Sequence, residues 1–325
     1  MTDPVTLPES DRPEATGQVA DATDNWVDRL APPATRPYLR LSRADRPIGT
    51  WLLLLPCWWG ALLAAGTVGY SWTVLWVFVA SGAGAFLMRG AGCTWNDITD
   101  RDIDGKVART RSRPIPSGRV SVRAAAVWMV AQAGLAFLIL LTFHPLAIWL
   151  GVGSLALVAI YPFAKRFTWW PQVFLGLAFN WGALLCWAAV TGSLSAAPVA
   201  LYLSGIMWTL FYDTIYAHQD KEDDALIGVR STARLFGAAT HAWLRGFLVA
   251  TVILMGVAVM LAYGPGRNVL ALVLALAAPW AMGWHLVWQL RHLDTEDPEN
   301  CLRLFRSNRD SGLIAGLFLA LAAAL

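Results

Sequence analysis

The sequence predicts an all-α integral membrane protein with nine transmembrane helices. Hydrophobic residues make up 57% of the 325 residues and charged residues only 14%, whereas soluble domains carry about 25% charged residues. Apolar runs recur from residue 47 onward, most of them near the ~20 residues needed to cross a bilayer. Lys and Arg concentrate in every second loop. Because lipid offers no partners to backbone polar groups, runs of this length are expected to be helices.

The nine expected spans follow one another with short connections. They are residues 47–66, 72–94, 122–142, 145–162, 172–191, 196–216, 242–263, 268–289 and 312–325. The last run is short for a full crossing. It is expected either to tilt or to be supplemented by residues before Gly312.

The placement of Lys and Arg predicts the orientation. The loops after the first, third and fifth spans carry none, and the loop after the seventh carries only Arg267, while the other side holds nearly all of them. The positive-inside rule then places the N-terminus in the cytoplasm. We expect a multi-pass protein of the bacterial inner (cytoplasmic) membrane, with its active site on the cytoplasmic side.

Residues 1–40 differ from the rest of the chain. They are acidic and contain no apolar run, which predicts a disordered cytoplasmic tail. The acidity and the lack of a basic region argue against a signal peptide or a mitochondrial transit peptide. Residues 41–325 are expected to form the transmembrane domain.

A dense run of carboxylates follows the second span. If its helix continues, Asp97, Asp100 and Asp104 fall at i, i+3 and i+7 on one face. Asn96 then lies one turn from Asp100. Stacked carboxylates repel one another unless cations lie among them, and oxygen ligands suit Mg²⁺ held together with substrate phosphates. The run therefore predicts a Mg²⁺–phosphate site at the membrane surface.

A second acidic run follows the sixth span on the same side. Asp213, Asp220 and Asp224 are spaced i, i+7 and i+11, again one face of a continuing helix. The two runs lie four spans apart, as in the weak internal duplications of multispanning proteins. Two related halves would then enclose a central cleft with acid on both walls and room for two ions.

Basic side chains complement these acids. Lys165 and Arg166 follow the fourth span and, together with bound ions, suit a diphosphate. Arg89 lies inside the second span, two turns before Asn96, and an ionisable residue in a span indicates function. It is expected either to pair with an aspartate or to contact substrate. His218 is expected to be a polar surface residue rather than a base.

Several longer stretches make the chain similar to a known family. The acidic runs match NDxxDxxxD at residues 96–104 and DxxxD at 220–224, with YDTxYA at 212–217. Further stretches are RADRPIG (43–49), MRGAGC (88–93), RPIPSG (113–118), YPFAKR (161–166) and ENCLRLFRSNR (299–309). From about residue 40 to its end the chain resembles the UbiA superfamily of intramembrane aromatic prenyltransferases, and within it the 4-hydroxybenzoate polyprenyltransferases of ubiquinone biosynthesis. It departs at Ser112, where many members have Asn.

The resemblance implies a nine-helix bundle with a central cavity and cytoplasmic helical caps. Two Mg²⁺ ions would bridge the Asp motifs to a polyprenyl diphosphate whose tail lies toward the lipid bilayer, and 4-hydroxybenzoate would be the acceptor; no nucleic-acid partner is expected. The implied metal ligands are Asn96, Asp97, Asp100, Asp104, Asp220 and Asp224, and the five aspartates among them act in catalysis with Asp213. The implied substrate-binding residues are Arg43, Arg89, Asn96, Lys165 and Arg166. Arg43 or Arg89 would hold the benzoate carboxylate, and Asp213 would hydrogen-bond the phenol.

Three alternatives are weighed against this interpretation. A CDP-alcohol phosphatidyltransferase would share DGxxAR at residues 104–109, but Arg101 and Val122 stand where that signature requires aspartates. Prenyltransferases for menaquinone, haem or homogentisate synthesis share the acidic motifs and differ in the acceptor. A cation transporter would favour acids near mid-membrane, whereas these acids lie at helix ends beside basic loops.

Overall fold

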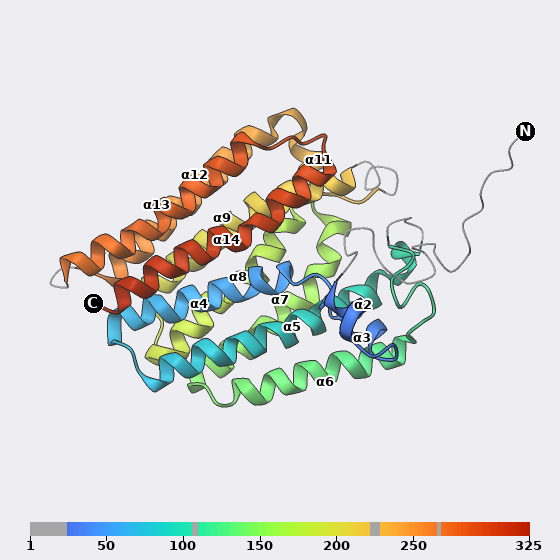
Figure 1. Ribbon diagram of the computed structural model, residues 1–325, viewed down its shortest axis with the longest axis horizontal. Coiled ribbons are helices and arrows are strands. Elements are labelled where there is room, and N and C mark those ends of the chain that lie inside the picture. Colours follow the sequence, from blue (N-terminus) through green and yellow to red (C-terminus); the bar gives the residue numbers. More distant parts are fainter. Residues whose placement is uncertain (1–24, 106–109, 222–227, 265–267) are drawn as a thin grey trace, which may run out of the picture. The chain divides into compact units, whose positions relative to one another are not determined.

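The computed structural model describes residues 25–105, 110–221, 228–264 and 268–325 (Figure 1). In these segments all regular structure is helical. The long helices of this part of the chain are α4 (Ile48–Val68), α5 (Trp72–Asp104), α6 (Val122–Leu140), α7 (Pro145–Phe167), α8 (Pro171–Thr191), α9 (Ala196–Ala217), α12 (Thr240–Ala262), α13 (Val269–Arg291) and α14 (Pro298–Ala323). Each corresponds to one expected span, and α5 and α14 extend well beyond theirs.

Seven of these helices, counted over the described residues, have the length and composition to cross a membrane. α9 and α14 have the length but are not apolar enough, so the count of nine spans stays a prediction. Large aromatic side chains on the spans face outward, with Trp72, Trp149 and Trp284 exposing 84%, 74% and 78% of their surface. Water would not favour such faces, but a bilayer does. The chain is a multi-pass integral membrane protein.

Local sequence determines where several helices begin and end. α7 begins at Pro145, and the His144 ring accepts a hydrogen bond from the Leu146 amide at 3.2 Å. α8 begins at Pro171 and ends at Thr191, and the following C-cap residue Gly192 has a φ of +70°, in the left-handed region that glycine tolerates. These are the ordinary start and stop signals of helices.

The last helix is longer than the short ninth apolar run. α14 begins at Pro298, where Asp297 accepts hydrogen bonds from the amides of Glu299 and Asn300, and it runs for 26 residues. Its length is therefore about 39 Å, and residues before Gly312 belong to the same helix as the apolar run, while a full crossing of the membrane by α14 stays a prediction. The added turns carry the charged residues of ENCLRLFRSNR.

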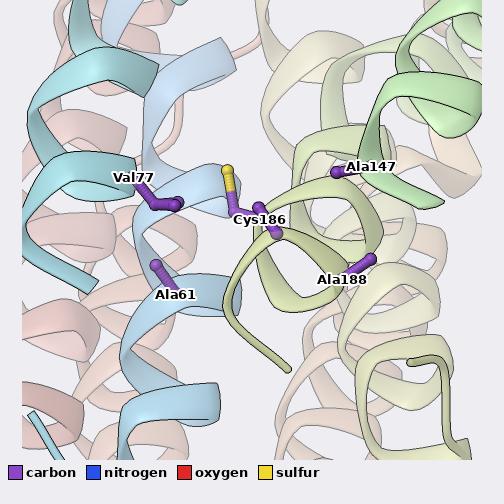
Figure 2. Close-up of a cluster of buried hydrophobic side chains, with 6 residues drawn as sticks. Ala61, Val77, Ala147, Cys186 and Ala188 are labelled. Carbon is purple, nitrogen blue, oxygen red and sulfur yellow. The ribbon is translucent and has the colours of Figure 1, made fainter. Parts of the chain in front are cut away.

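The chain divides into two compact units, one formed by Met1–Gly49 and Phe86–Phe137 and one by Thr50–Ala85 and Leu138–Leu325. In the larger unit, α9 packs against α8, α12 and α14, and α13 packs between α12 and α14 (Figure 1). Small residues permit close helix contact within this unit. Figure 2 shows such a cluster, in which Ala61, Val77, Ala147, Cys186 and Ala188 meet from α4, α5, α7 and α8.

The smaller unit contains the N-terminal helices α2 (Trp26–Leu30) and α3 (Arg36–Leu41). The predicted disordered tail of residues 1–40 is wrong for residues 25–40, because specific contacts order them: Val27 and Ala31 pack on Ala44, and Arg40 pairs with Asp28. Residues 1–24 lie outside the described residues.

Candidate active site

The first acidic motif lies on the last turns of α5. The helix continues without a break through Asp104, so the expected sharing of one face is confirmed. Asp97 and Asp100 have no exposed surface and Asp104 exposes 5%, whereas the side chain of Asp102 is 83% exposed. Because a buried carboxylate is costly without a compensating charge, the three inward aspartates require cationic partners.

Two arginines supply this charge. Arg43 Nη2 donates to Asp97 Oδ1 at 2.5 Å. Arg113 Nη1 donates to Asp104 Oδ2 at 2.7 Å and to Asp97 Oδ1 at 3.3 Å, so one guanidinium joins two carboxylates of the motif. Burial alone would lower the pKa of Arg43, but the Asp97 carboxylate outweighs this effect and holds that pKa above its ordinary value.

The backbone at Arg43 adopts an unusual conformation. Its φ is +55°, the one positive value among the non-glycine residues that the structure describes. This left-handed conformation costs about 1–2 kcal/mol. It is stabilised by the Arg43 amide and Nη1, which donate to the Arg40 carbonyl at 3.1 and 3.0 Å, and by Trp26 Nε1, which donates to the Ala44 carbonyl at 2.7 Å. The turn directs the guanidinium onto Asp97.

The motif retains a free oxygen that suits a metal ion. Asp97 Oδ2 is buried and accepts no hydrogen bond in the described structure, although Oδ1 of the same carboxylate has two donors. A hard cation such as Mg²⁺ prefers such an oxygen. In the described residues, no three His, Cys, Asp or Glu side chains converge on one point. The observation that suits a metal is thus the unpartnered Asp97 Oδ2, and Asp100 and Asp104 are buried on the same helix face.

The second acidic motif departs from the expected helix. α9 ends at Ala217, and one 3₁₀ turn, His218–Asp220, follows. The predicted i, i+7 spacing from Asp213 to Asp220 on a continuing α-helix is therefore wrong, because a 3₁₀ turn has 3.0 residues per turn rather than 3.6. Asp213 is half-buried on the last full turn of α9. The side chain of Asp220, and Asp224 entirely, lie outside the described residues.

The residues around Asp213 form a buried polar chain. Asn180 Nδ2 donates to Thr209 Oγ1 at 2.8 Å, and Thr209 Oγ1 donates to the Tyr212 hydroxyl at 3.1 Å. These contacts join α8 to the turn of α9 that presents Asp213. His218 is buried rather than exposed, contrary to expectation, and burial, followed by the charge of Lys221, lowers its pKa to about 4.

The remaining predicted site residues lie on the ends and faces of α5 and α7. Asn96 and Arg89 are half-buried on α5 in the smaller unit. Lys165 is half-buried and Arg166 exposed in the last turn of α7 in the larger unit. The Lys165 carbonyl accepts a hydrogen bond from the Arg230 amide at 3.5 Å, and the Arg166 guanidinium lies 5.1 Å from the centre of the Phe163 ring.

Arg113 is one of the basic residues after the first acidic motif that the sequence suggests for a diphosphate, and the structure pairs it with the carboxylates of that motif instead. The ordered helix α2 was not expected from the sequence. Arg113 begins a compact turn in which the Gly118 amide donates to the Ile115 carbonyl and the Val120 amide to the Pro114 carbonyl, each at 3.0 Å. Ile115 and Val120 pack on Leu41 in the smaller unit. The signal for Arg113 was its position before Pro114, where a rigid turn can return the side chain to α5.

The fold and the site define a class of polytopic α-helical membrane protein with an aspartate–arginine cluster at the end of a span. Residues 53–321 match the UbiA prenyltransferase family. The chain belongs to this family.

Relatives and solved structures are similar over most of the chain. It is 51% identical over 298 residues to the mitochondrial 4-hydroxybenzoate polyprenyltransferase of Bos taurus, covering 91% of this chain and 77% of the relative. It is 48% identical over 311 residues to that of Homo sapiens, covering 95% and 81%. The apo structure of a UbiA homolog from Aeropyrum pernix K1 has a TM-score of 0.64 at 23% identity, covering 84% of this chain and 97% of that one. A UbiA homolog from Archaeoglobus fulgidus bound to GPP and Mg²⁺ has a TM-score of 0.62 at 20% identity, covering 89% and 99%. These likenesses show that the fold is shared.

Proposed function

We propose that the protein transfers a polyprenyl group from polyprenyl diphosphate to the ring carbon ortho to the hydroxyl of 4-hydroxybenzoate, in ubiquinone biosynthesis. The observation that carries this proposal is the 51% identity, over 91% of the chain, to a relative named for this activity. The buried aspartate–arginine cluster at the end of α5 supports it. An allylic diphosphate is bound by cations, and carboxylates fixed in place are needed to hold those cations.

The proposal includes dependence on Mg²⁺. A neighbour of the same fold is described as bound to GPP and Mg²⁺, and the unpartnered Asp97 Oδ2 suits such an ion. Bound Mg²⁺ would neutralise the charge of the departing diphosphate. The residues proposed to hold it are Asn96, Asp97, Asp100, Asp104, Asp220 and Asp224.

The chain's own side chains then have separate tasks. Lys165 and Arg166 are proposed to bind the diphosphate from the end of α7. Asp213 is proposed to accept a hydrogen bond from the phenol, and an arginine to bind the carboxylate at the opposite end of the acceptor ring. An apolar cavity would exclude water, which would otherwise capture the allylic cation.

The reaction balances without any further reactant. The allylic C–O bond of the diphosphate breaks and its electron pair leaves with the diphosphate. The ring carbon ortho to the phenol donates an electron pair to the allylic cation, forming a C–C bond. Loss of the proton from that carbon restores aromaticity, so the products are prenylated 4-hydroxybenzoate, diphosphate and a proton.

The proposed location is a bacterial inner membrane with the N-terminus and the acidic motifs in the cytoplasm. The support is the concentration of Lys and Arg in the loops after even-numbered spans. Labelling of a single engineered cysteine at Ser193 or at Ser117 by an impermeant maleimide tests it in intact cells. The proposed orientation predicts labelling at residue 193 and none at residue 117. Labelling at residue 117 alone would overturn the orientation.

The decisive test is prenyl transfer in isolated membranes with polyprenyl diphosphate and labelled 4-hydroxybenzoate, with Mg²⁺ or EDTA. We expect Mg²⁺-dependent product from the wild type, loss of about 100-fold or more in Asp97→Ala, and near-normal product from the control Asp102→Ala, whose side chain is exposed on the same helix. Product on a different aromatic acceptor would remove the acceptor assignment and keep the family chemistry. Cation uptake without consumption of diphosphate would favour a transporter instead.

A further inference from the structure

Gly49, the second residue of α4, lies against the guanidinium of Arg89. A Cβ atom built on Gly49 would lie 2.5 Å from both Nε and Nη2 of Arg89 and 2.7 Å from its Cζ. The guanidinium therefore occupies the position where the side chain of any other residue would begin. Gly49 and Arg89 belong to the same compact unit of the chain.

The backbone that carries Arg89 is held by a second close approach. A Cβ on Gly90 would lie 2.0 Å from Gln132 Oε1 and 3.0 Å from the Cβ of Ser42. Ser42 Oγ donates to Gln132 Oε1 at 2.9 Å in a buried hydrogen bond and accepts from Trp128 Nε1 at 2.9 Å in a partly buried one, so two hydrogen bonds hold this contact. Gly90 thus fixes the base of the Arg89 side chain, and Gly49 determines where its guanidinium lies.

Of the two arginines considered for the acceptor carboxylate, Arg43 is already held by groups of the first acidic motif and its neighbouring turn. Arg43 is buried, and its two terminal nitrogens donate to Asp97 and to the Arg40 carbonyl. Rotation of Arg43 toward a ligand would leave the Asp97 carboxylate with only Arg113. Arg89 is half-buried on the α5 face that leads to Asn96. The geometry therefore favours Arg89 as the carboxylate-binding residue.

We propose that Gly49 is a positioning residue that seats the Arg89 guanidinium for the carboxylate of the aromatic acceptor. This inference rests on the proposed function. A guanidinium binds a carboxylate through two parallel hydrogen bonds, which depend on its orientation. A methyl group at residue 49 displaces the end of a flexible side chain and no backbone atom, so it misaligns Arg89 without obstructing the fold, and alanine is the better helix former.

The test compares Gly49→Ala with the control Gly134→Ala, whose added Cβ on α6 would meet no atom within 4 Å. We expect Gly49→Ala to raise the KM for 4-hydroxybenzoate about tenfold. The KM for polyprenyl diphosphate and the melting temperature should stay at the wild-type values, and Gly134→Ala should change none of the three. Arg89→Gln should raise the same KM at least as much, and Gly49→Ala in the Arg89→Gln background should add nothing, because both changes remove one interaction.

Each outcome separates this inference from the function on which it rests. An unchanged KM in Gly49→Ala alongside a raised KM in Arg89→Gln overturns the positioning role and leaves the carboxylate assignment. Additive effects of the two changes also overturn it, because they would show that Gly49 acts independently of Arg89. Failure of the wild type to use 4-hydroxybenzoate, with prenyl transfer to another acceptor, overturns the proposed function itself.

Discussion

Replacement of Arg113 by Gln should destabilise the protein, because this guanidinium is shared by two buried carboxylates. Removing one partner of a buried ion pair costs about 3–5 kcal/mol. Asp97 keeps Arg43 as a partner at 2.5 Å, so we expect the lower end, about 3 kcal/mol. For a chain of this size each kcal/mol corresponds to about 2 °C, which gives a decrease in melting temperature of about 6 °C.

Thermal unfolding in detergent, followed with a thiol-reactive dye, measures this decrease. Cys93, Cys186 and Cys301 are buried free thiols and report unfolding when they become accessible. The matched control is Arg101→Gln, since Arg101 lies on α5, the helix that carries the buried aspartates, and pairs at 3.6 Å with an exposed carboxylate, a contact worth less than about 1 kcal/mol. A melting temperature for Arg113→Gln within 1 °C of the control would refute the claim that Arg113 neutralises the buried aspartates.

Two further predictions concern the larger unit. Folding lowers the pKa of His218 from 6.5 to about 4. The contribution of the neutral His218 ring to the stability of the folded protein is therefore fully present above pH 6.5 and is lost as the pH decreases toward 4. The loss of stability is at most about 3 kcal/mol. Between pH 6.5 and 4 the melting temperature of His218→Gln should therefore decline less steeply than that of the wild type. Equal slopes in the two proteins would contradict the lowered pKa of His218. Asn308 accepts from Trp208 Nε1 at 2.9 Å and exchanges hydrogen bonds with Gln289 at 3.0 and 3.3 Å. Asn308→Ala should therefore lower the free energy of unfolding by about 3 kcal/mol. The control Ser307→Ala loses one hydrogen bond within its own helix and should lower it by less than about 1 kcal/mol. Equal decreases in the two variants would rule out a stabilising role for the buried hydrogen bonds of Asn308.

Local patterns predicted the helices and the first acidic face with accuracy. Apolar runs determine where a helix can lie in a membrane. The helices α7 and α8 accordingly begin at Pro145 and Pro171, at or one residue before the expected spans 145–162 and 172–191. The three aspartates after the second span share a face because the helix continues, which periodicity alone predicts. Burial of Asp97 and Asp100 follows from that shared face.

Patterns failed where geometry depends on contacts that are distant in sequence. The spacing after Asp213 suggested one more helical face, but α9 passes into a 3₁₀ turn at His218. His218 then packs near Thr240, with Nε2 3.4 Å from its hydroxyl, which makes it buried. No spacing rule along one segment could have indicated that a residue 22 positions later covers this ring.

The N-terminal segment shows how an average composition hides individual contacts. Over 40 residues the acidity and proline content indicate disorder. Yet Trp26 donates to the Ala44 carbonyl and Asp28 pairs with the Arg40 guanidinium, both close to the first span. Those two contacts flank Arg43, whose left-handed backbone needs support from both sides. The orientation of the arginine that holds Asp97 is thus determined partly by residues ahead of the first membrane span. We therefore expect the proposed active centre to depend on α2, although no acidic motif or transmembrane run lies there.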